Sequence, residues 1–396
     1  MNIKSKIIAV IILCLGVFRT SLTAQTFVDV SVEAGLPILS GLGYSGVWLD
    51  YNNDGWLDIL CYSQQTYLFK NEGDGTFTNV TSQAGLSGIS LDTYSIADFD
   101  TDGWDDLLVA TNSGELLILQ NQNGVYQTFL SLSPIGTVAR AVWIDFNGDG
   151  WLDIFACRWL EGPLVFKNAG GNIFEDISEQ LNLPPNSGNT VSAGDFNNDG
   201  FTDVYMGRNG GNQLFKNVAG STFINLPPGG GFSDFRNTVS VAWGDYDEDG
   251  FLDIYSANIA SNRNVLYKNN GDETFTDITT AAGVQDVGDA RTATFIDYNN
   301  DSYPDIFTTN HVHPNRLYKN NGDETFTDVA VSSNISGPPD GFGISWGDYD
   351  KDGDLDVIIV SHTSRILNLL RNEGGNSKNW LFVKLQGSFD NKTGVG

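Results

Sequence analysis

Residues 243–255, WGDYDEDGFLDIY, carry the pattern that decides the fold, because close copies of this stretch recur along the chain. The six other copies begin at Trp48 (WLDYNNDGWLDIL), Ala97 (ADFDTDGWDDLLV), Trp143 (WIDFNGDGWLDIF), Ala193 (AGDFNNDGFTDVY), Phe295 (FIDYNNDSYPDIF) and Trp346 (WGDYDKDGDLDVI). Their first aspartates are 47 to 52 residues apart. Repeats of this length are typical of propellers and solenoids.

Each repeat contains four short runs that have the character of β-strands. In the fifth repeat, residues 240–244 lead into the acidic turn and residues 251–257 leave it. The third run reads LFKN or LYKN, and the fourth reads TFTNV or TFTDI. Four strands per repeat predict an all-β fold, a seven-bladed β-propeller, with a parallel solenoid as the alternative.

The two ends of the repeat region complement each other. The seventh repeat lacks the fourth run, whereas TFVDVSVEAGL at residues 26–36 closely matches TFTDITTAAGV at residues 274–284. We therefore predict that the propeller spans residues 26–372 and that the N-terminal strand completes the last blade. Such an arrangement closes the ring and removes exposed sheet edges.

The segment before the propeller has the features of an export signal. Lys4 and Lys6 precede an apolar run at residues 7–18, and small or polar residues follow up to Ala24. This order predicts a signal peptide over residues 1–24. The apolar run is too short to span a bilayer, so we expect a secreted, periplasmic or cell-surface protein without a membrane span. Cys61 and Cys157 fall in non-adjacent blades, which predicts buried free thiols rather than a disulfide.

The charge of the chain excludes one class of partner. Among its 396 residues, 21 are Lys or Arg and 49 are Asp or Glu, which gives a formal net charge of −28. A surface of this sign gains nothing from contact with a polyanion, so the composition argues against a nucleic-acid partner.

The acidic turns have the spacing of a calcium loop. They follow D-x-[DN]-x-D-G-x-x-D, so side-chain oxygens fall at positions 1, 3, 5 and 9 and a backbone carbonyl is available at position 7. Ca²⁺ takes six to eight oxygen ligands, and a glycine at position 6 permits the sharp turn around it. We predict up to seven Ca²⁺ ions, with the following ligands: Asp50, Asn52, Asp54, Trp56 and Asp58; Asp98, Asp100, Asp102, Trp104 and Asp106; Asp145, Asn147, Asp149, Trp151 and Asp153; Asp195, Asn197, Asp199, Phe201 and Asp203; Asp245, Asp247, Asp249, Phe251 and Asp253; Asp297, Asn299, Asp301, Tyr303 and Asp305; Asp348, Asp350, Asp352, Asp354 and Asp356.

A metal-free alternative exists, because Asp, Asn and Gly favour tight turns on their own account. Turn preference does not explain seven copies of a nine-residue spacing, and three or four carboxylates that converge without a counter-ion repel one another. The sixth turn is the weakest candidate, since Ser302 replaces the glycine and Pro304 stiffens the exit.

These turns resemble the FG-GAP or VCBS repeats of integrin α-type propellers. Phe342-Gly343, ahead of Gly347-Asp348, is the nearest copy of the Phe-Gly element. Residues 373–396, with Asn379-Trp380-Leu381, Val383, Leu385, Gly387, Asn391-Lys392, Gly394 and Gly396, are similar to the opening of an ASPIC/UnbV domain. A propeller followed by that domain resembles the cartilage-acidic-protein-like family, and the resemblance implies a truncated second domain here.

The face opposite the acidic turns collects the scarce cationic side chains. We predict a ligand-binding rim there, formed by Arg140, Arg158, Arg208, Arg291, Arg316, His311, His313 and His362. An arginine-rich rim suits an acidic glycan or an acidic protein segment. The alternative is that each arginine pairs with a neighbouring acid. The histidines could hold a transition metal or could simply be exposed loop residues.

No Ser, Cys or His nucleophile arrangement stands out, so the chain offers no catalytic residues that we can assign. The sequence favours an exported, calcium-binding module for adhesion or for binding glycans or extracellular proteins. The alternative function is a polysaccharide lyase on a calcium propeller, because such chemistry needs little more than Arg, His and Tyr in a groove.

Overall fold

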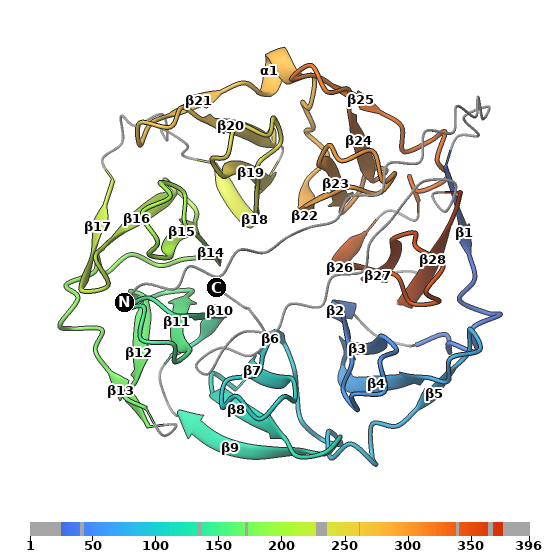
Figure 1. The fold of residues 1–396 in the computed structure, drawn as a ribbon, viewed down its shortest axis with the longest axis horizontal. Helices are drawn as coiled ribbons and strands as arrows, with labels where there is room; N and C mark the ends of the chain where they lie inside the picture. The colour runs from blue at the N-terminus through green and yellow to red at the C-terminus, as the bar shows by residue number, and fades with distance from the viewer. Residues whose placement is uncertain are drawn as a thin grey trace, which may run out of the picture.

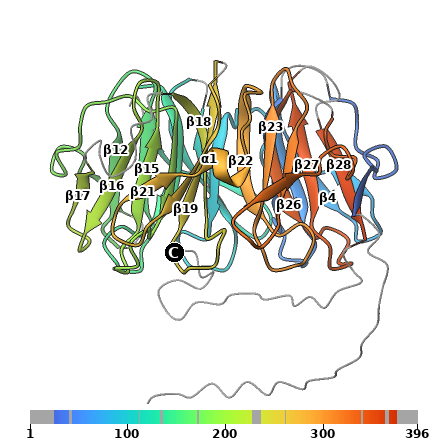
Figure 2. The same ribbon diagram turned by 90° about the horizontal axis from the view of Figure 1, so that it is seen from above.

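The computed structural model describes residues 25–39, 43–111, 113–132, 136–170, 173–226, 236–260, 262–337, 340–362 and 367–374. These residues form seven four-stranded antiparallel sheets arranged as a ring (Figure 1). Figure 2 shows the ring edge-on, as a flat disc. The seven-bladed, all-β prediction is therefore confirmed. The predicted signal peptide at residues 1–24 and all but the first two residues of the segment 373–396 lie outside the described residues.

Every blade has the same strand order, from the inside of the ring to the outside. The innermost strands, which end at the acidic turns, are β2 (Gly43–Leu49), β6 (Thr93–Ala97), β10 (Val138–Ile144), β14 (Thr190–Gly194), β18 (Asn237–Gly244), β22 (Ala290–Ile296) and β26 (Gly341–Gly347). The second strands, which begin at the last aspartate of each turn, are β3 (Asp58–Ser63), β7 (Asp106–Ala110), β11 (Asp153–Arg158), β15 (Asp203–Gly207), β19 (Asp253–Ile259), β23 (Asp305–Asn310) and β27 (Asp356–Ser361).

Two further strands complete the outer half of each blade. The third strands are β4 (Gln65–Asn71), β8 (Leu116–Asn121), β12 (Leu164–Asn168), β16 (Gln213–Val218), β20 (Val265–Asn269), β24 (Arg316–Asn320) and β28 (Leu367–Glu373). The outermost strands are β5 (Phe77–Asn79), β9 (Tyr126–Leu132), β13 (Phe174–Asp176), β17 (Thr222–Asn225), β21 (Phe275–Asp277), β25 (Phe326–Asp328) and β1 (Thr26–Asp29). Strand β1 pairs antiparallel with β28, in register from Thr26 opposite Glu373 to Asp29 opposite Leu370.

Helix is nearly absent. The described residues contain one four-residue helix, α1 (Thr279–Ala282). No described helix is long and apolar enough to cross a bilayer.

The hydrophobic core lies between neighbouring blades rather than in one central mass. At the seam between the last and first blades, for example, Ile358 and Val360 of β27 pack with Ile59 and Cys61 of β3. Aromatic rings bridge this seam, where Trp48 stacks on Tyr349 with ring centroids 5.8 Å apart and planes 3° from parallel. Cys61 and Cys157 are both buried and free, which confirms the prediction of unpaired thiols.

The close approach of the blades needs small residues on the innermost strands. A Cβ added to Gly244, just before the fifth acidic turn, would lie 2.5 Å from the ring of Phe295 in the next blade. Atoms cannot approach that closely, so an alanine here would push the two sheets apart.

Each third strand carries a buried asparagine at or near its end, and six of these seven side chains bridge to the preceding blade. Asn269 is 1% exposed, and its side-chain amide donates to the backbone oxygen of Phe196 in the preceding blade (2.8 Å) and to that of Leu252 in its own blade (3.1 Å). Its Oδ1 accepts the N–H of Gly271 at 3.0 Å. Asn71, Asn121, Asn217, Asn320 and Asn372 likewise donate to a backbone oxygen of the preceding blade.

We expect Asn269→Ala to lower the free energy of unfolding by roughly 2–4 kcal/mol, because it leaves buried backbone groups without partners. The matched control is Asn270→Ala, which alters an exposed side chain and should change stability by less than about 0.5 kcal/mol. Urea denaturation in excess calcium measures both. Equal losses in the free energy of unfolding for the two substitutions would show that the bridge formed by Asn269 does not contribute to stability.

Candidate functional site

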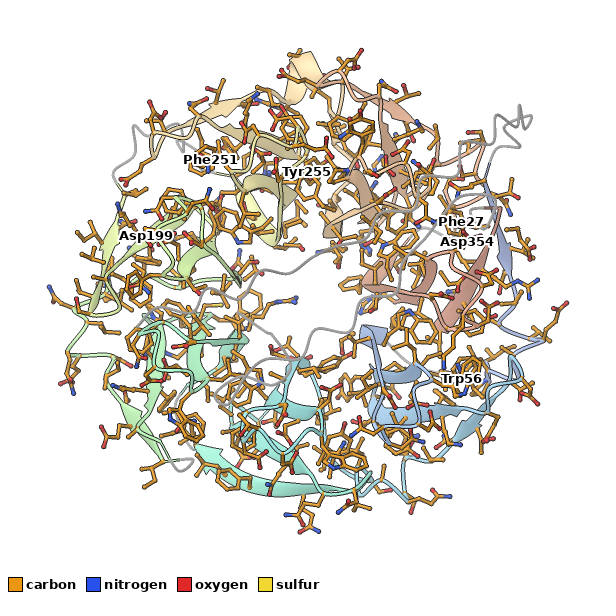
Figure 3. All side chains as sticks on the ribbon, viewed as in Figure 1. Phe27, Trp56, Asp199, Phe251, Tyr255 and Asp354 are labelled. Atoms are coloured by element: carbon orange, nitrogen blue, oxygen red, sulfur yellow. The ribbon has the colours of Figure 1, made fainter. Side chains whose placement is uncertain are left out.

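The seven acidic turns lie at equivalent places around the ring, where the innermost strand of each blade meets the second. We call them loop 1 (50–58), loop 2 (98–106), loop 3 (145–153), loop 4 (195–203), loop 5 (245–253), loop 6 (297–305) and loop 7 (348–356). Figure 3 labels Trp56, Asp199, Phe251 and Asp354, which come from four of these loops and lie in separate blades, away from the centre of the ring.

Each loop is shaped by its own aspartates. In loop 5, Asp245 accepts the N–H of Asp249 (3.0 Å) and of Gly250 (2.9 Å), and Asp249 accepts the N–H of Phe251 (3.0 Å). The residue at position 4, Glu248, has a φ of 59°. The first aspartate of every loop accepts the same two N–H groups, from positions 5 and 6. These hydrogen bonds define the shape of each turn without a bound ion.

The ninth position of each loop is a buried carboxylate. Asp253 is fully buried, and its two oxygens accept the N–H of Asn269 (2.8 Å) and of Tyr246 (3.1 Å). Burial, the largest contribution, raises the pKa of Asp253 to about 8 and that of Asp356 to about 9. A cation beside these carboxylates would favour the charged form.

Four loops bring three carboxylates into one place. Ligand atoms from the members of each group lie within 4.8 Å of one another: Asp98, Asp100 and Asp106; Asp245, Asp247 and Asp253; Asp297, Asp301 and Asp305; Asp348, Asp350 and Asp356. Among the described residues, loops 1, 3 and 4 form no such group. Each of these three loops carries asparagine at position 3, as does loop 6, which nevertheless brings its three carboxylates together.

Position 3 leaves buried polar atoms without a partner. The side chain of Asp247 is 7% exposed and its Oδ1 accepts no hydrogen bond, and the Oδ1 atoms of Asn299 and Asp350 are also buried and unpaired. Buried oxygens are normally satisfied. An ion bound in the loop would satisfy them, so the residues present fit a hard cation such as Ca²⁺.

Loop 6 adopts the same turn although it lacks the glycine. Ser302 has a φ of 77°, and its N–H donates to Asp297 at 2.8 Å, as the glycine does elsewhere. A side chain in this left-handed region is strained by about 1–2 kcal/mol. Loop 6 therefore differs from the other loops in the backbone strain at Ser302 and not in the type of turn.

On the opposite face, several of the predicted ligand-binding cations already have acidic partners. Arg158 contacts Glu161, and Arg316 lies 2.8 Å from Asp328. Arg140 is exposed, and the Nε of Arg208 is buried without a hydrogen bond. The pairing alternative therefore holds for Arg158 and Arg316.

Arg291, His311 and His362 do come together, around Phe342. The guanidinium carbon of Arg291 lies 4.8 Å from the centroid of the Phe342 ring, and the His362 ring stacks on Phe342 at 4.5 Å. His311 meets the same ring edge-on at 6.0 Å. Register shifts at the start of β22 and β26 leave Arg291 and Phe342 as the extra residue of a β-bulge, a device that re-aims side chains.

Asp340 is the member of this cluster that the sequence does not single out. It is 3% exposed, its Oδ1 contacts Nδ1 of His311, and its Oδ2 has no hydrogen-bond partner. Its φ of 83° is rare for a residue with a side chain. The one indication of its role in the sequence is its position just before Gly341-Phe342-Gly343.

The histidines do not assemble a transition-metal site in the described residues. No group of three metal-ligating side chains there contains a histidine. Nδ1 of His313 lies 3.2 Å from the backbone oxygen of Gly288, apart from the Phe342 cluster.

We expect Ser302→Gly to raise the free energy of unfolding by about 1 kcal/mol, because glycine occupies the left-handed region without strain. The reciprocal control is Gly250→Ser in loop 5, where the φ is 89° and a loss of similar size should follow. Chemical denaturation in chelator, which removes any contribution from bound metal, measures both. No gain from Ser302→Gly would mean that the loop tolerates serine without strain.

Comparisons with known proteins agree with this geometry. The model of the FG-GAP-like repeat matches residues 50–109, 98–156, 145–206, 195–256, 245–308 and 297–359. Cartilage acidic protein 1 of Xenopus tropicalis is 29% identical over 171 residues, which cover 38% of this chain and 26% of that protein. The mouse (Mus musculus) protein of the same name is 28% identical over 207 residues, which cover 45% of this chain and 30% of that protein.

The matched region thus spans less than a third of the length of these relatives. Among solved structures, an Agrocybe aegerita lectin that recognises non-reducing terminal N-acetylglucosamine has a TM-score of 0.50 and 18% identity, and the match covers 74% of this chain and 84% of the lectin. At that identity the likeness concerns the fold alone. The family match covers most of the propeller repeat by repeat, and the chain belongs to the FG-GAP-like repeat family.

Proposed function

We propose that this protein is an exported, calcium-stabilised propeller that serves as an extracellular module for adhesion or for binding glycans or proteins. The observation that carries the calcium part is the set of buried, unpaired oxygens at position 3, on Asp247, Asn299 and Asp350. Export rests on the signal-peptide pattern of residues 1–24.

Oxygen-only ligands and a flexible acidic loop suit Ca²⁺ better than Mg²⁺, which demands a strict octahedron and keeps several waters. When bound, the ion supplies positive charge that offsets the repulsion among the loop carboxylates. The position-9 aspartate then links the loop to blade packing: in loop 5, Tyr246 donates its N–H to Asp253, while its backbone oxygen accepts from Asn320 of the next blade at 2.8 Å. An ordered loop therefore also orders the blade interface.

Chelation should lower the melting temperature, since a site filled at 100 times its Kd contributes about 2.7 kcal/mol. The metal-free protein should become more stable as the pH falls from 8 towards 5. Burial raises the pKa of Asp253 to about 8, so the folded state takes up protons that the unfolded state has released in this range. The calcium-dependent gain in melting temperature should be larger at pH 8 than at pH 5.5, because protons compete for the same oxygens.

Thermal melts with calcium, with magnesium and with chelator, together with metal analysis, test these expectations. Magnesium is the control for non-specific charge screening. A melting temperature that ignores chelation, or fewer than about four bound Ca²⁺ ions, contradicts the calcium role.

The ligand part rests on the cluster around Phe342. Arg291 lies 3.8 Å from Asp289, too far for a hydrogen bond, so its guanidinium retains donors for an anion. The side chain of His311 is 32% exposed and is held by Asp340, which leaves its other ring nitrogen as a second contact. Arginine and histidine presented together suit a carboxylate or sulfate, as carried by acidic glycans and acidic peptides.

We expect Arg140→Ala combined with Arg291→Ala to abolish capture of an acidic ligand, since both residues belong to the predicted rim. The probes are arrays of uronate-containing, sulfated and neutral glycans, with retention of each measured at fixed calcium. Arg263→Ala is the matched control, because Arg263 is engaged by Asp277 at 2.6 Å.

Unchanged retention by the double variant would refute the rim. Binding without loss of polymer supports a glycan-binding module, and binding to no glycan favours a protein partner. A new absorbance from unsaturated uronate would instead favour the lyase alternative.

A further inference from the structure

The residue just before the buried asparagine of each third strand differs between blades. It is Lys70, Lys167, Lys216, Lys268 or Lys319 in five blades, Gln120 in blade 2 and Arg371 in blade 7. Four of the five lysines reach the acidic loop of their own blade. Lys319 lies 3.1 Å from Asp301, Lys70 lies 3.5 Å from Asp54, Lys167 lies 3.9 Å from Asp149, and Lys268 contacts Asp247. Lys216 contacts Glu273 of the next blade instead.

Blades 2 and 7 depart from this arrangement. In loop 2, the uncharged side-chain amide of Gln120 donates to Asp100, next to four predicted carboxylate ligands. In blade 7, Arg371 donates to Glu373 at 2.8 Å, and loop 7 carries aspartate at all four side-chain ligand positions. Loop 2 therefore combines four carboxylates with an uncharged neighbour, and loop 7 combines four carboxylates with an arginine whose ion pair is with Glu373 rather than with the loop.

The lysine does not take the place of a bound ion. In loop 5, Lys268 contacts Asp247 through Oδ2 alone and also pairs with Glu324 of the next blade at 3.1 Å, whereas Oδ1 of Asp247 stays buried and unpaired. The side chain of Asp247 is 7% exposed, so water has little access to this oxygen. The ammonium thus neutralises part of the ligand charge while one ligand oxygen still lacks a partner.

We propose that this third-strand position sets the calcium affinity of each loop, so that loops 2 and 7 fill first and loops 1, 3, 5 and 6 fill at higher calcium. The inference rests on the calcium binding proposed above and adds the order in which the loops fill. Its physical basis is direct: a fixed ammonium a few ångströms from the ion repels it, and carboxylate count tunes affinity in oxygen-ligand sites. A unit charge at this range should change the affinity of one loop roughly tenfold.

Calcium titration of the full chain by calorimetry, with native mass spectrometry to count ions, tests the order of filling. The wild-type protein should show a tight class of sites that precedes a weaker class. Gln120→Lys should move one ion from the tight class to the weaker one, and the uncharged control Gln120→Met should leave the tight class intact. Lys319→Gln should tighten one weak site roughly tenfold, whereas Lys319→Arg, which keeps the charge, should not.

The two lysine variants keep the test decisive if Gln120→Lys fails to fold, which melting in excess calcium would reveal. Binding to all loops with one affinity, or isotherms that neither charge change alters, overturns the inference while the calcium function stands. An absence of calcium binding in the wild-type protein is a different outcome, because it removes the calcium function itself.

Discussion

The propeller depends on one interaction that recurs around the ring: a buried aspartate at the end of each acidic loop that accepts N–H groups from two directions. The second of these comes from the side-chain amide of Asn299 in loop 6 and from the backbone in the other loops. Asp253 accepts from Asn269 on the third strand and from Tyr246 within its own loop. A bare charge at that depth is unfavourable, as the raised pKa of Asp253 records. The loop that precedes it offers the remedy, since the same turn presents several oxygens to a cation.

The asparagine that follows makes this arrangement collective. Asn320 donates its N–H to Asp305 of its own blade at 2.7 Å and its side-chain amide to Tyr246 of the preceding blade at 2.8 Å. Aromatic stacking and the absence of side chains at positions such as Gly244 bring the sheets close enough for that contact. In six of the seven repeats, one asparagine and one aspartate therefore link the order of the loop, the pairing of the strands and the packing of the blades.

Much of this architecture could be predicted because its signals are local. A nine-residue spacing of acids, repeated seven times, is visible in the sequence, and so is the match between residues 26–36 and 274–284. The bridging asparagines were not predicted, because LFKN reads as the end of a strand and the partner carbonyl lies in another repeat. The same reason hides Asp340, whose role comes from a contact with His311 that the fold creates.

The opposite face shows the limit of reasoning from residue type. Arginine content alone cannot separate Arg158, which contacts Glu161, from Arg291, which stacks on Phe342. What distinguishes them is a β-bulge at the start of β22, a feature of backbone register that cannot be predicted from the residue types alone. Likewise, His311 and His313 are two residues apart, yet only His311 joins the cluster.

The pairing of β1 with β28 has a consequence for how the chain folds. Phe27 and Asn372 are partners although nearly the whole propeller separates them in sequence. Loop-closure entropy opposes such a contact until the intervening blades are in place, so this pairing should form late. Among the strands of the propeller, β1 is synthesised first and its partner β28 last. Until β28 has been made, β1 and its apolar residue Phe27 have no strand to pair with. The last blade is therefore the last to be completed, because its two ends meet only after the other blades have formed.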